Sequence, residues 1–173
     1  RYFRTMVDRS ESKERGVWQC SAVLEGHLGA VYDLSSGDPG TLWSVGGDGC
    51  LVRWTRRDGA WNPQGMAMAK ADEALFCVRV LPNGEVLAGG ASGGLIAWTN
   101  AGVEILGGHA GGTFVVTDQW SAGADGHLRR WRTGESVGSF PGRIRCVLDT
   151  RRGTRAGLHD GHAARLGSTL PQS

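Results

Sequence analysis

The sequence predicts an all-β fold, and three of its features support that prediction. Apolar and polar residues alternate over short runs, glycine-rich turns separate these runs, and no segment has the apolar spacing of a helix. Internal repetition indicates in addition how the strands are organised. Residues 42–54 and 119–131 share one skeleton, in which a serine precedes an aspartate by four residues and the aspartate precedes a tryptophan by six. Repetition on this scale indicates an architecture of similar units.

Two weaker copies extend the repeat. Residues 86–98 keep the glycines and the tryptophan but have Ala88 in place of the serine and Ser92 in place of the aspartate. Residues 155–166 keep an Asp-Gly turn and end in leucine. Asp-Gly between two strand-like runs predicts a tight hairpin. The four turns, at Asp48, Ser92, Asp125 and Asp160, are 44, 33 and 35 residues apart. This spacing suits four-stranded antiparallel units, such as β-propeller blades of ~40–45 residues.

The first part of the chain has two alternating segments, residues 1–8 and 17–24, on either side of a polar stretch. They predict two strands joined by an exposed loop. Because the first strand has no preceding turn and no initiator methionine, we expect residues 1–25 to be the end of a preceding blade.

Each later unit is expected to contain strand, turn, strand, Asp-Gly hairpin, strand, loop and strand. The innermost strands align as residues 30–34, 74–78, 112–116 and 143–147. Polar connections at 56–59, 100–102 and 132–135 precede fourth strands at 60–67, 103–106 and 136–140. The chain therefore divides into residues 1–25, blades at 26–68, 69–107 and 108–141, and an incomplete last blade at 142–173.

Composition limits the classes of function. The net charge of +2 is mixed in sign, which predicts no nucleic-acid partner. No apolar run approaches the ~18–20 residues of a membrane helix, and the first residues do not resemble a signal peptide. Four scattered cysteines, with no Cys-x-x-Cys pair, are expected to be small buried hydrophobic residues in a reducing, cytoplasmic compartment: Cys20, Cys50, Cys77 and Cys146. The sequence indicates no cofactor and no metal.

Two of the repeats resemble the WD repeats of β-propellers, and the resemblance covers nearly the whole chain. The matching residues are Gly26-His27, Ser44, Asp48 and Trp54, and then Gly108-His109, Ser121, Asp125 and Trp131. The resemblance implies that the His, Ser, Asp and Trp of one repeat form a hydrogen-bonded tetrad that clamps the blade. The tetrads would be His27, Ser44, Asp48 and Trp54, and His109, Ser121, Asp125 and Trp131.

The chemistry of these residue types suits a structural role. A carboxylate that accepts from an imidazole, which in turn bonds a hydroxyl, satisfies every buried polar group, and a buried indole N–H needs an acceptor such as serine. Losing one member leaves the others unpaired, at roughly 1–3 kcal/mol each. The repeat around Trp98 lacks the histidine and the aspartate, and the last repeat lacks the serine and the tryptophan. These two blades are expected to be held together by packing alone and to be less stable than the other two.

The number of repeats predicts a partial ring. A closed ring of the family that the repeats resemble typically has seven blades, or about 280–300 residues at ~40–45 each. The chain is therefore expected to be part of a larger propeller. The alternatives are a four-bladed ring and a half-ring closed by a second copy, because an open arc would expose unpaired strand edges.

Catalytic and metal sites are weaker interpretations. Ser44, His27 and Asp48 are the residue types of a catalytic triad, but the set recurs in the third blade and no Gly-x-Ser-x-Gly elbow surrounds either serine. His159 and His162, with an aspartate between them, form a loose metal-ligand set on a hairpin turn. A solvated turn is the preferred interpretation.

A candidate partner-binding set comes from the aligned innermost strands. Tyr32, Phe76, Phe114 and Arg145 share one position in four successive units, and Arg143 adds a second guanidinium. The family resemblance implies that this position reaches the surface beside the central channel. Tyrosine, phenylalanine and arginine are also residue types of interfaces, although packing between blades is an equal alternative.

The expected function is a non-catalytic scaffold that holds a protein or peptide, with an acidic or phosphorylated partner favoured by the arginines. The alternatives are a propeller-type enzyme acting in the channel and a regulatory module of a larger protein.

Overall fold

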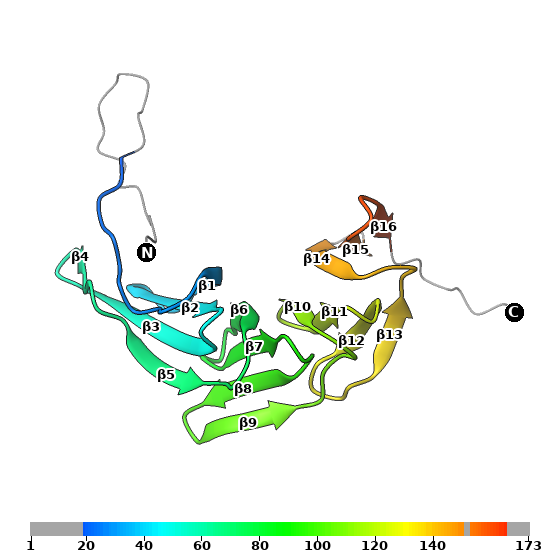
Figure 1. The fold of residues 1–173 in the computed structure, drawn as a ribbon, viewed down its shortest axis with the longest axis horizontal. Helices are drawn as coiled ribbons and strands as arrows, with labels where there is room; N and C mark the ends of the chain where they lie inside the picture. Colours follow the sequence, from blue (N-terminus) through cyan, green and yellow to red (C-terminus); the bar gives the residue numbers. More distant parts are fainter. Residues whose placement is uncertain (1–18, 151–152, 166–173) are drawn as a thin grey trace, which may run out of the picture.

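The computed structural model describes residues 19–150 and 153–165, and the regular structure within them consists of β-strands. Four small antiparallel sheets stand side by side as the blades of a β-propeller (Figure 1). The predicted all-β propeller fold is therefore confirmed. The expected strand over residues 1–8 lies outside the described residues.

The first three sheets each have four principal strands in sequential order. The first blade contains β1 (Val31–Ser36), β2 (Thr41–Gly46), β3 (Cys50–Arg57) and β5 (Met66–Lys70), while β4 (Ala60–Trp61) extends the outer end of β3. The second contains β6 (Leu75–Val80), β7 (Val86–Gly90), β8 (Leu95–Thr99) and β9 (Gly102–Leu106). The third contains β10 (Thr113–Val116), β11 (Trp120–Gly123), β12 (His127–Arg130) and β13 (Ser136–Ser139). The fourth contains β14 (Ile144–Thr150), β15 (Gly153–Leu158) and β16 (Ala163–Arg165).

The described blades follow an arc, with β1, β6, β10 and β14 along its inner side and the first and fourth blades at its two ends (Figure 1). The segment before the first blade runs along that blade: Glu25 forms a parallel bridge with Gln64, and Leu24 packs into a cluster with Val52 and Trp54. This part of the predicted preceding blade therefore contributes to the core of the first blade. The number of blades in the whole protein stays a prediction.

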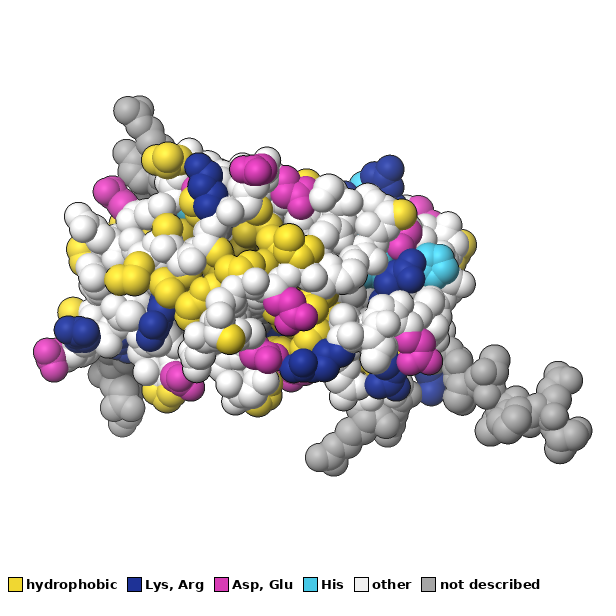
Figure 2. Space-filling model, turned by 90° about the horizontal axis from the view of Figure 1, so that it is seen from below, with side chains coloured by type: hydrophobic (Ala, Val, Ile, Leu, Met, Phe, Trp, Pro, Cys, Tyr) yellow, Lys and Arg dark blue, Asp and Glu magenta, His cyan; other side chains and the backbone are white. Residues whose placement is uncertain are grey.

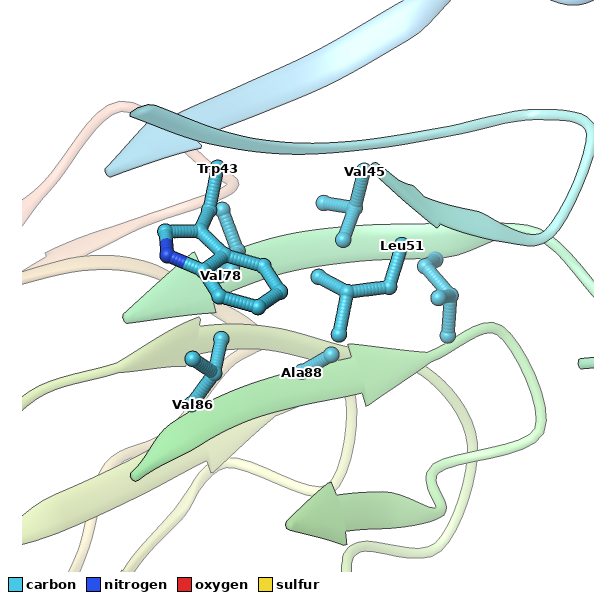
Figure 3. Packing of buried hydrophobic residues seen from close by; sticks show 7 residues of the cluster. Trp43, Val45, Leu51, Val78, Val86 and Ala88 are labelled. Carbon is cyan, nitrogen blue, oxygen red and sulfur yellow. The ribbon is translucent and has the colours of Figure 1, made fainter. Parts of the chain in front are cut away.

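Neighbouring blades are joined by a shared apolar core. Trp43, Val45 and Leu51 of the first blade meet Val78, Val86 and Ala88 of the second (Figure 3). Trp98 lies beside this cluster, with its ring centroid 5.0 Å from that of Trp43. Full burial of one such aliphatic side chain contributes about 1.5–3 kcal/mol. Successive side chains of a strand point to opposite faces of the sheet, and consecutive residues of β7 are buried, so the second blade packs on both faces.

Polar bonds also cross between blades. The Asp33 carboxylate accepts from the Val78 amide at 2.8 Å, and the Ser35 hydroxyl accepts from the Val80 amide at 3.0 Å. Between the second and third blades, the Arg79 guanidinium pairs with Asp118 at 2.7 Å. These bonds fix the register of one inner strand against the next.

The hairpin glycines allow the blades to approach closely. Gly49 has a φ of 73°, and a Cβ there would lie 2.6 Å from the carbonyl oxygen of Glu73 in the loop before β6. The Gly49 carbonyl accepts from the Ala71 amide at 2.9 Å. A side chain at this position would therefore push the second blade away from the first.

The innermost strand of every blade has an irregularity at one and the same position. The pairing register with the second strand shifts between Val31 and Asp33, Leu75 and Cys77, Thr113 and Val115, and Ile144 and Cys146. A bulge leaves one residue out of the ladder and redirects its side chain. The four bulged residues are Tyr32, Phe76, Phe114 and Arg145.

The outer rim carries an apolar groove between the first and second blades. It encloses about 310 Å³ and is lined by residues that include Met68, Ala69, Ile96, Trp98 and Val103. Figure 2 shows hydrophobic side chains gathered in a hollow on the outer face.

Two sequence expectations need correction or comment. Burial of the cysteines was wrong in part: Cys77 is buried and Cys50 partly so, but Cys20 and Cys146 are exposed. The first blade continues through β5 to Lys70, beyond the expected boundary at residue 68. No helix among the described residues is long and apolar enough to cross a membrane.

Candidate functional site

In the first blade, all four residues of the predicted tetrad are joined. The ring nitrogen Nδ1 of His27 lies 3.0 Å from Asp48 Oδ1, and Nε2 lies 2.7 Å from Ser44 Oγ. The indole N–H of Trp54 donates to the same Ser44 oxygen at 2.8 Å. The chain of bonds thus connects the loop before β1 with β2, the hairpin and β3.

The protons of this chain can be assigned from its geometry. The Asp48 carboxylate can only accept, so Nδ1 of His27 carries the hydrogen, and Nε2 can accept from the Ser44 hydroxyl. Burial of Asp48 disfavours its charged form. Hydrogen bonds from His27 and the amides of Cys50 and Leu28 outweigh burial and lower the pKa of Asp48 to about 2.

The third blade brings together three of its four predicted members. His109 Nδ1 donates to Asp125 Oδ1 at 2.9 Å, and Nε2 lies 3.0 Å from Ser121 Oγ. Trp131 does not join them, which corrects the expected tetrad. Its indole N–H donates instead to the carbonyl oxygen of Asp118 at 3.2 Å.

An arginine supplies a further bond to this aspartate. Arg129 donates to Asp125 Oδ2 at 3.0 Å. Burial of Asp125 acts against its charge, but the His127 amide, the His109 ring and Arg129 outweigh it and hold the pKa of Asp125 far below its usual range. Burial also lowers the pKa of His109, even though Asp125 acts to raise it.

The second blade has a substitute for the tetrad that sequence reasoning missed. Glu73, in the loop before β6, accepts from the hydroxyl of Ser92 at 2.8 Å and from the amide of the same residue. The acid therefore comes from the loop and the hydroxyl from the hairpin, the reverse of the His27–Asp48 arrangement. The expectation that this blade depends on packing alone was wrong.

The fourth blade has only a local cap at its hairpin. Asp160 accepts from the amide of His162 at 3.1 Å, and the His162 ring lies 3.1 Å from the same oxygen. The ring nitrogen Nδ1 of His159 accepts from Nε of Arg145 at 3.3 Å. Among the described residues, no group of three or more potential ligands is placed to hold a metal.

Neither serine of the tetrad sets has the surroundings of a nucleophile. Ser44 and Ser121 are each 1% exposed, and the Trp54 indole covers the Ser44 oxygen. A substrate carbonyl needs open space beside the attacking oxygen and donors for the developing charge. These sites are filled by the protein's own side chains, so their chemistry is structural.

The predicted partner-binding residues form a continuous row across the arc, which we call the central row: Tyr32, Phe76, Phe114 and Arg145. Tyr32 meets Phe76 edge to face with ring centroids 5.5 Å apart, and Phe76 lies 5.6 Å from Phe114. The Arg145 guanidinium stands 4.2 Å above the Phe114 ring. Each of the four is the bulged residue of its inner strand.

Exposure differs along the central row. Tyr32 is 53% exposed and Arg145 is exposed, while Phe76 and Phe114 are partly buried between them. Arg143 is exposed two residues before Arg145, and its carbonyl accepts from the His159 amide at 2.9 Å. The row thus presents a polar group at each end of an aromatic centre.

Comparisons with known proteins agree with this architecture. No protein-family profile matches the sequence, and no curated protein matches it. Among solved structures, the computationally designed Ika4 protein is similar with a TM-score of 0.66 at 18% identity, over 87% of this chain and 98% of its own. The WD40 β-propeller domain of Doa1 is similar with a TM-score of 0.51 at 16% identity, over 84% of this chain and 68% of its own. The chain has the β-propeller fold that both of these structures have.

Proposed function

We propose that the chain is a non-catalytic interaction scaffold that holds a protein or peptide partner on the central row. The observation that supports this most is the recurrence of the bulge. In each of four successive inner strands, the register shift leaves one of these residues out of the ladder: Tyr32, Phe76, Phe114 or Arg145. Bulges concentrate where a side chain must be directed at a ligand.

The chemistry of the row suits a peptide with an acidic or phosphorylated group beside an apolar one. Aromatic rings supply contact area at little entropic cost, and a guanidinium pairs with carboxylates and phosphates through two parallel bonds. The Arg145 guanidinium is already held by Phe114 and His159. A preorganised side chain loses less conformational freedom on binding. We place this activity in the cytoplasm, on the basis of the scattered cysteines in the sequence.

The experiment is a comparison of two double variants as baits. Tyr32→Ala with Arg145→Ala removes the two exposed ends of the row, while Ile105→Ala with Arg57→Ala removes an exposed apolar residue and an exposed arginine from the outer rim. Partners captured by the wild-type protein should be lost with the first variant and kept with the second. Both variants should keep the wild-type circular dichroism spectrum and melting temperature.

Equal capture by both variants would contradict the proposal. A propeller-type enzyme would instead show turnover that falls with Asp48→Asn or Asp125→Asn by more than the loss of folded protein explains.

A further inference from the structure

A second candidate binding site lies between the first and second blades, at the opposite end of β1 and β6 from the central row. A cavity of about 480 Å³ opens there, bounded by the last residues of β1 and by the turn after β6. Its walls include the indoles of Trp43 and Trp98 and the guanidinium groups of Arg53 and Arg79. This volume is within the range of sites that take small molecules or a few peptide residues, about 300–1,000 Å³.

One charge in this cavity lacks an acceptor. Arg53 stands across the strand pair from Trp43, with its guanidinium carbon 5.9 Å from the centre of that ring. Its Nε is buried and has no hydrogen-bond partner. Arg79, Arg129, Arg130 and Arg132 each have an acid at ion-pair distance, whereas no described residue forms an ion pair with Arg53. A buried N–H without a partner is rare, and Nε of Arg129 is the other example among the described residues. Arg53 differs from Arg129 because its side chain lines a cavity, where the other nitrogens of its guanidinium can meet a ligand.

The third blade contains the same cross-strand pair in a different setting. Arg130 stands opposite Trp120, with its guanidinium carbon 4.9 Å from the ring centre. There the charge meets Glu135 at 3.5 Å, and the Arg130 side chain is 52% exposed. The third blade thus pairs its arginine with an acid at the surface, whereas Arg53 lines a cavity and is paired with no acid of the described residues.

Among anions, the charges of the cavity lining favour a singly charged one over a dianion. Its lining includes Arg53 and Arg79, and also Asp38 and Asp118, of which Asp118 is already paired with Arg79. Two acids on the wall disfavour a phosphate dianion, while one unpaired guanidinium matches one carboxylate. Trp43 and Trp98 are the large apolar residues of the lining and can contact the rest of the ligand.

We propose that this cavity binds an aromatic carboxylate, with the carboxylate on Arg53 and the ring against Trp98. Such a ligand is either a free aromatic acid or the chain-terminal residue of a peptide. The site is separate from the central row and does not depend on the function proposed for that row.

The test is a calorimetric titration of the whole chain with two acids and their uncharged counterparts. Phenylacetate represents a free acid and N-acetylphenylalanine represents a peptide end, while phenylacetamide and N-acetylphenylalaninamide lack the charge. The acids should bind at least about tenfold more tightly than the amides, because a charge-assisted bond is lost. The tighter of the two acids identifies the source of the ligand.

Variants locate the site. Arg53→Gln should weaken binding of the acids about tenfold or more, and Arg53→Lys should weaken it less because the charge remains. Arg130→Gln, the matched change in the third blade, should leave the affinity unchanged. In NMR spectra of the wild-type protein, the indole N–H signals of Trp43 and Trp98 should shift when either acid is added, while the signal of Trp120 should not. This readout holds even if an Arg53 variant does not fold.

Four outcomes would overturn the proposal. They are absence of binding of either acid at millimolar concentration, equal loss with Arg53→Gln and Arg130→Gln, indole shifts confined to Trp120, and tighter binding of inorganic phosphate than of either acid.

Discussion

The first and third blades contain the same four residue types, with the serine, aspartate and tryptophan at the same spacing, but their hydrogen bonds differ. Trp54 lies within β3, a strand of eight residues, and pairs across the sheet with Leu42. The strand β12 has only four residues and ends at Arg130, one residue before Trp131. The position that would face Trp131 is Gln119, which lies in the turn before β11. A tryptophan beyond the end of the ladder cannot reach its serine.

The difference shows that the tetrad depends on strand length as well as on residue identity. In the first blade, the indole of Trp54 completes the polar chain. In the third, Arg129 supplies the additional bond to Asp125, and Trp131 packs into the core between the second and third blades. One motif thus gives two sets of contacts, one within a blade and one between blades.

Replacing the two aspartates should have the largest effect and should separate the blades. Asp125 accepts from His109, Arg129 and the amides of Ala110 and His127, whereas Asp48 has no arginine among its donors. Asp125→Ala should therefore lower the free energy of unfolding by about 3–5 kcal/mol, and Asp48→Ala by about 2–3 kcal/mol. Urea denaturation followed by tryptophan fluorescence measures both.

The matched control is Asp160→Ala on the exposed hairpin of the fourth blade, which should leave the stability unchanged. A larger loss for Asp48→Ala than for Asp125→Ala would contradict the role assigned to Arg129.

The pH dependence of the unfolding free energy should also differ between the first and third blades. The folded-state pKa of Asp48 is lowered to about 2, so its contribution to stability is present above the unfolded value of about 3.9 and is lost as the pH falls through 2. The lowered pKa of His109 means that the unfolded chain binds its proton first. Stability from the third blade should therefore already fall as the pH drops below about 6.5.

Unfolding free energies measured at several pH values between 7 and 3 should show the loss from the third blade at a higher pH than the loss from Asp48. In His109→Gln the loss just below about pH 6.5 should shrink while the loss below about pH 4 remains. An unchanged profile in this variant would count against the assigned role of His109.

The substitute bond in the second blade should have a smaller effect. Glu73→Ala removes the acceptor for the Ser92 amide and hydroxyl and should reduce stability by about 1 kcal/mol, with faster hydrogen exchange at the Ser92 amide. Glu104→Ala, an exposed acid on β9 of the same blade, is the control and should change neither quantity. Identical behaviour of the two variants would restore the view that this blade depends on packing alone.

Much of the fold could be predicted because each repeat is specified by residues that are close together in the sequence. Asp-Gly turns with strand-like runs on both sides, such as those at Asp48 and Asp125, specify hairpins through the backbone itself. Alignment of the innermost strands in the sequence also places four residues at one position, and the structure shows them in contact: Tyr32, Phe76, Phe114 and Arg145.

The remaining features depend on pairing between segments, which the sequence does not display. The bulges at the central row are a property of register between two strands. Trp131 was misplaced because β12 ends at Arg130, opposite the first residue of β11, so its end depends on where the neighbouring strand begins. Glu73 was missed because it replaces a histidine with a different residue type at a different position in the loop. An acid just before an inner strand was the one signal available.

The most direct test of the difference between the blades is a pair of double-mutant cycles. Ser44→Ala with Trp54→Phe probes the bond that closes the first tetrad, and Ser121→Ala with Trp131→Phe probes the same positions in the third blade. The coupling energy should be about 1 kcal/mol in the first cycle and within about 0.3 kcal/mol of zero in the second. Equal coupling in both cycles would contradict the account.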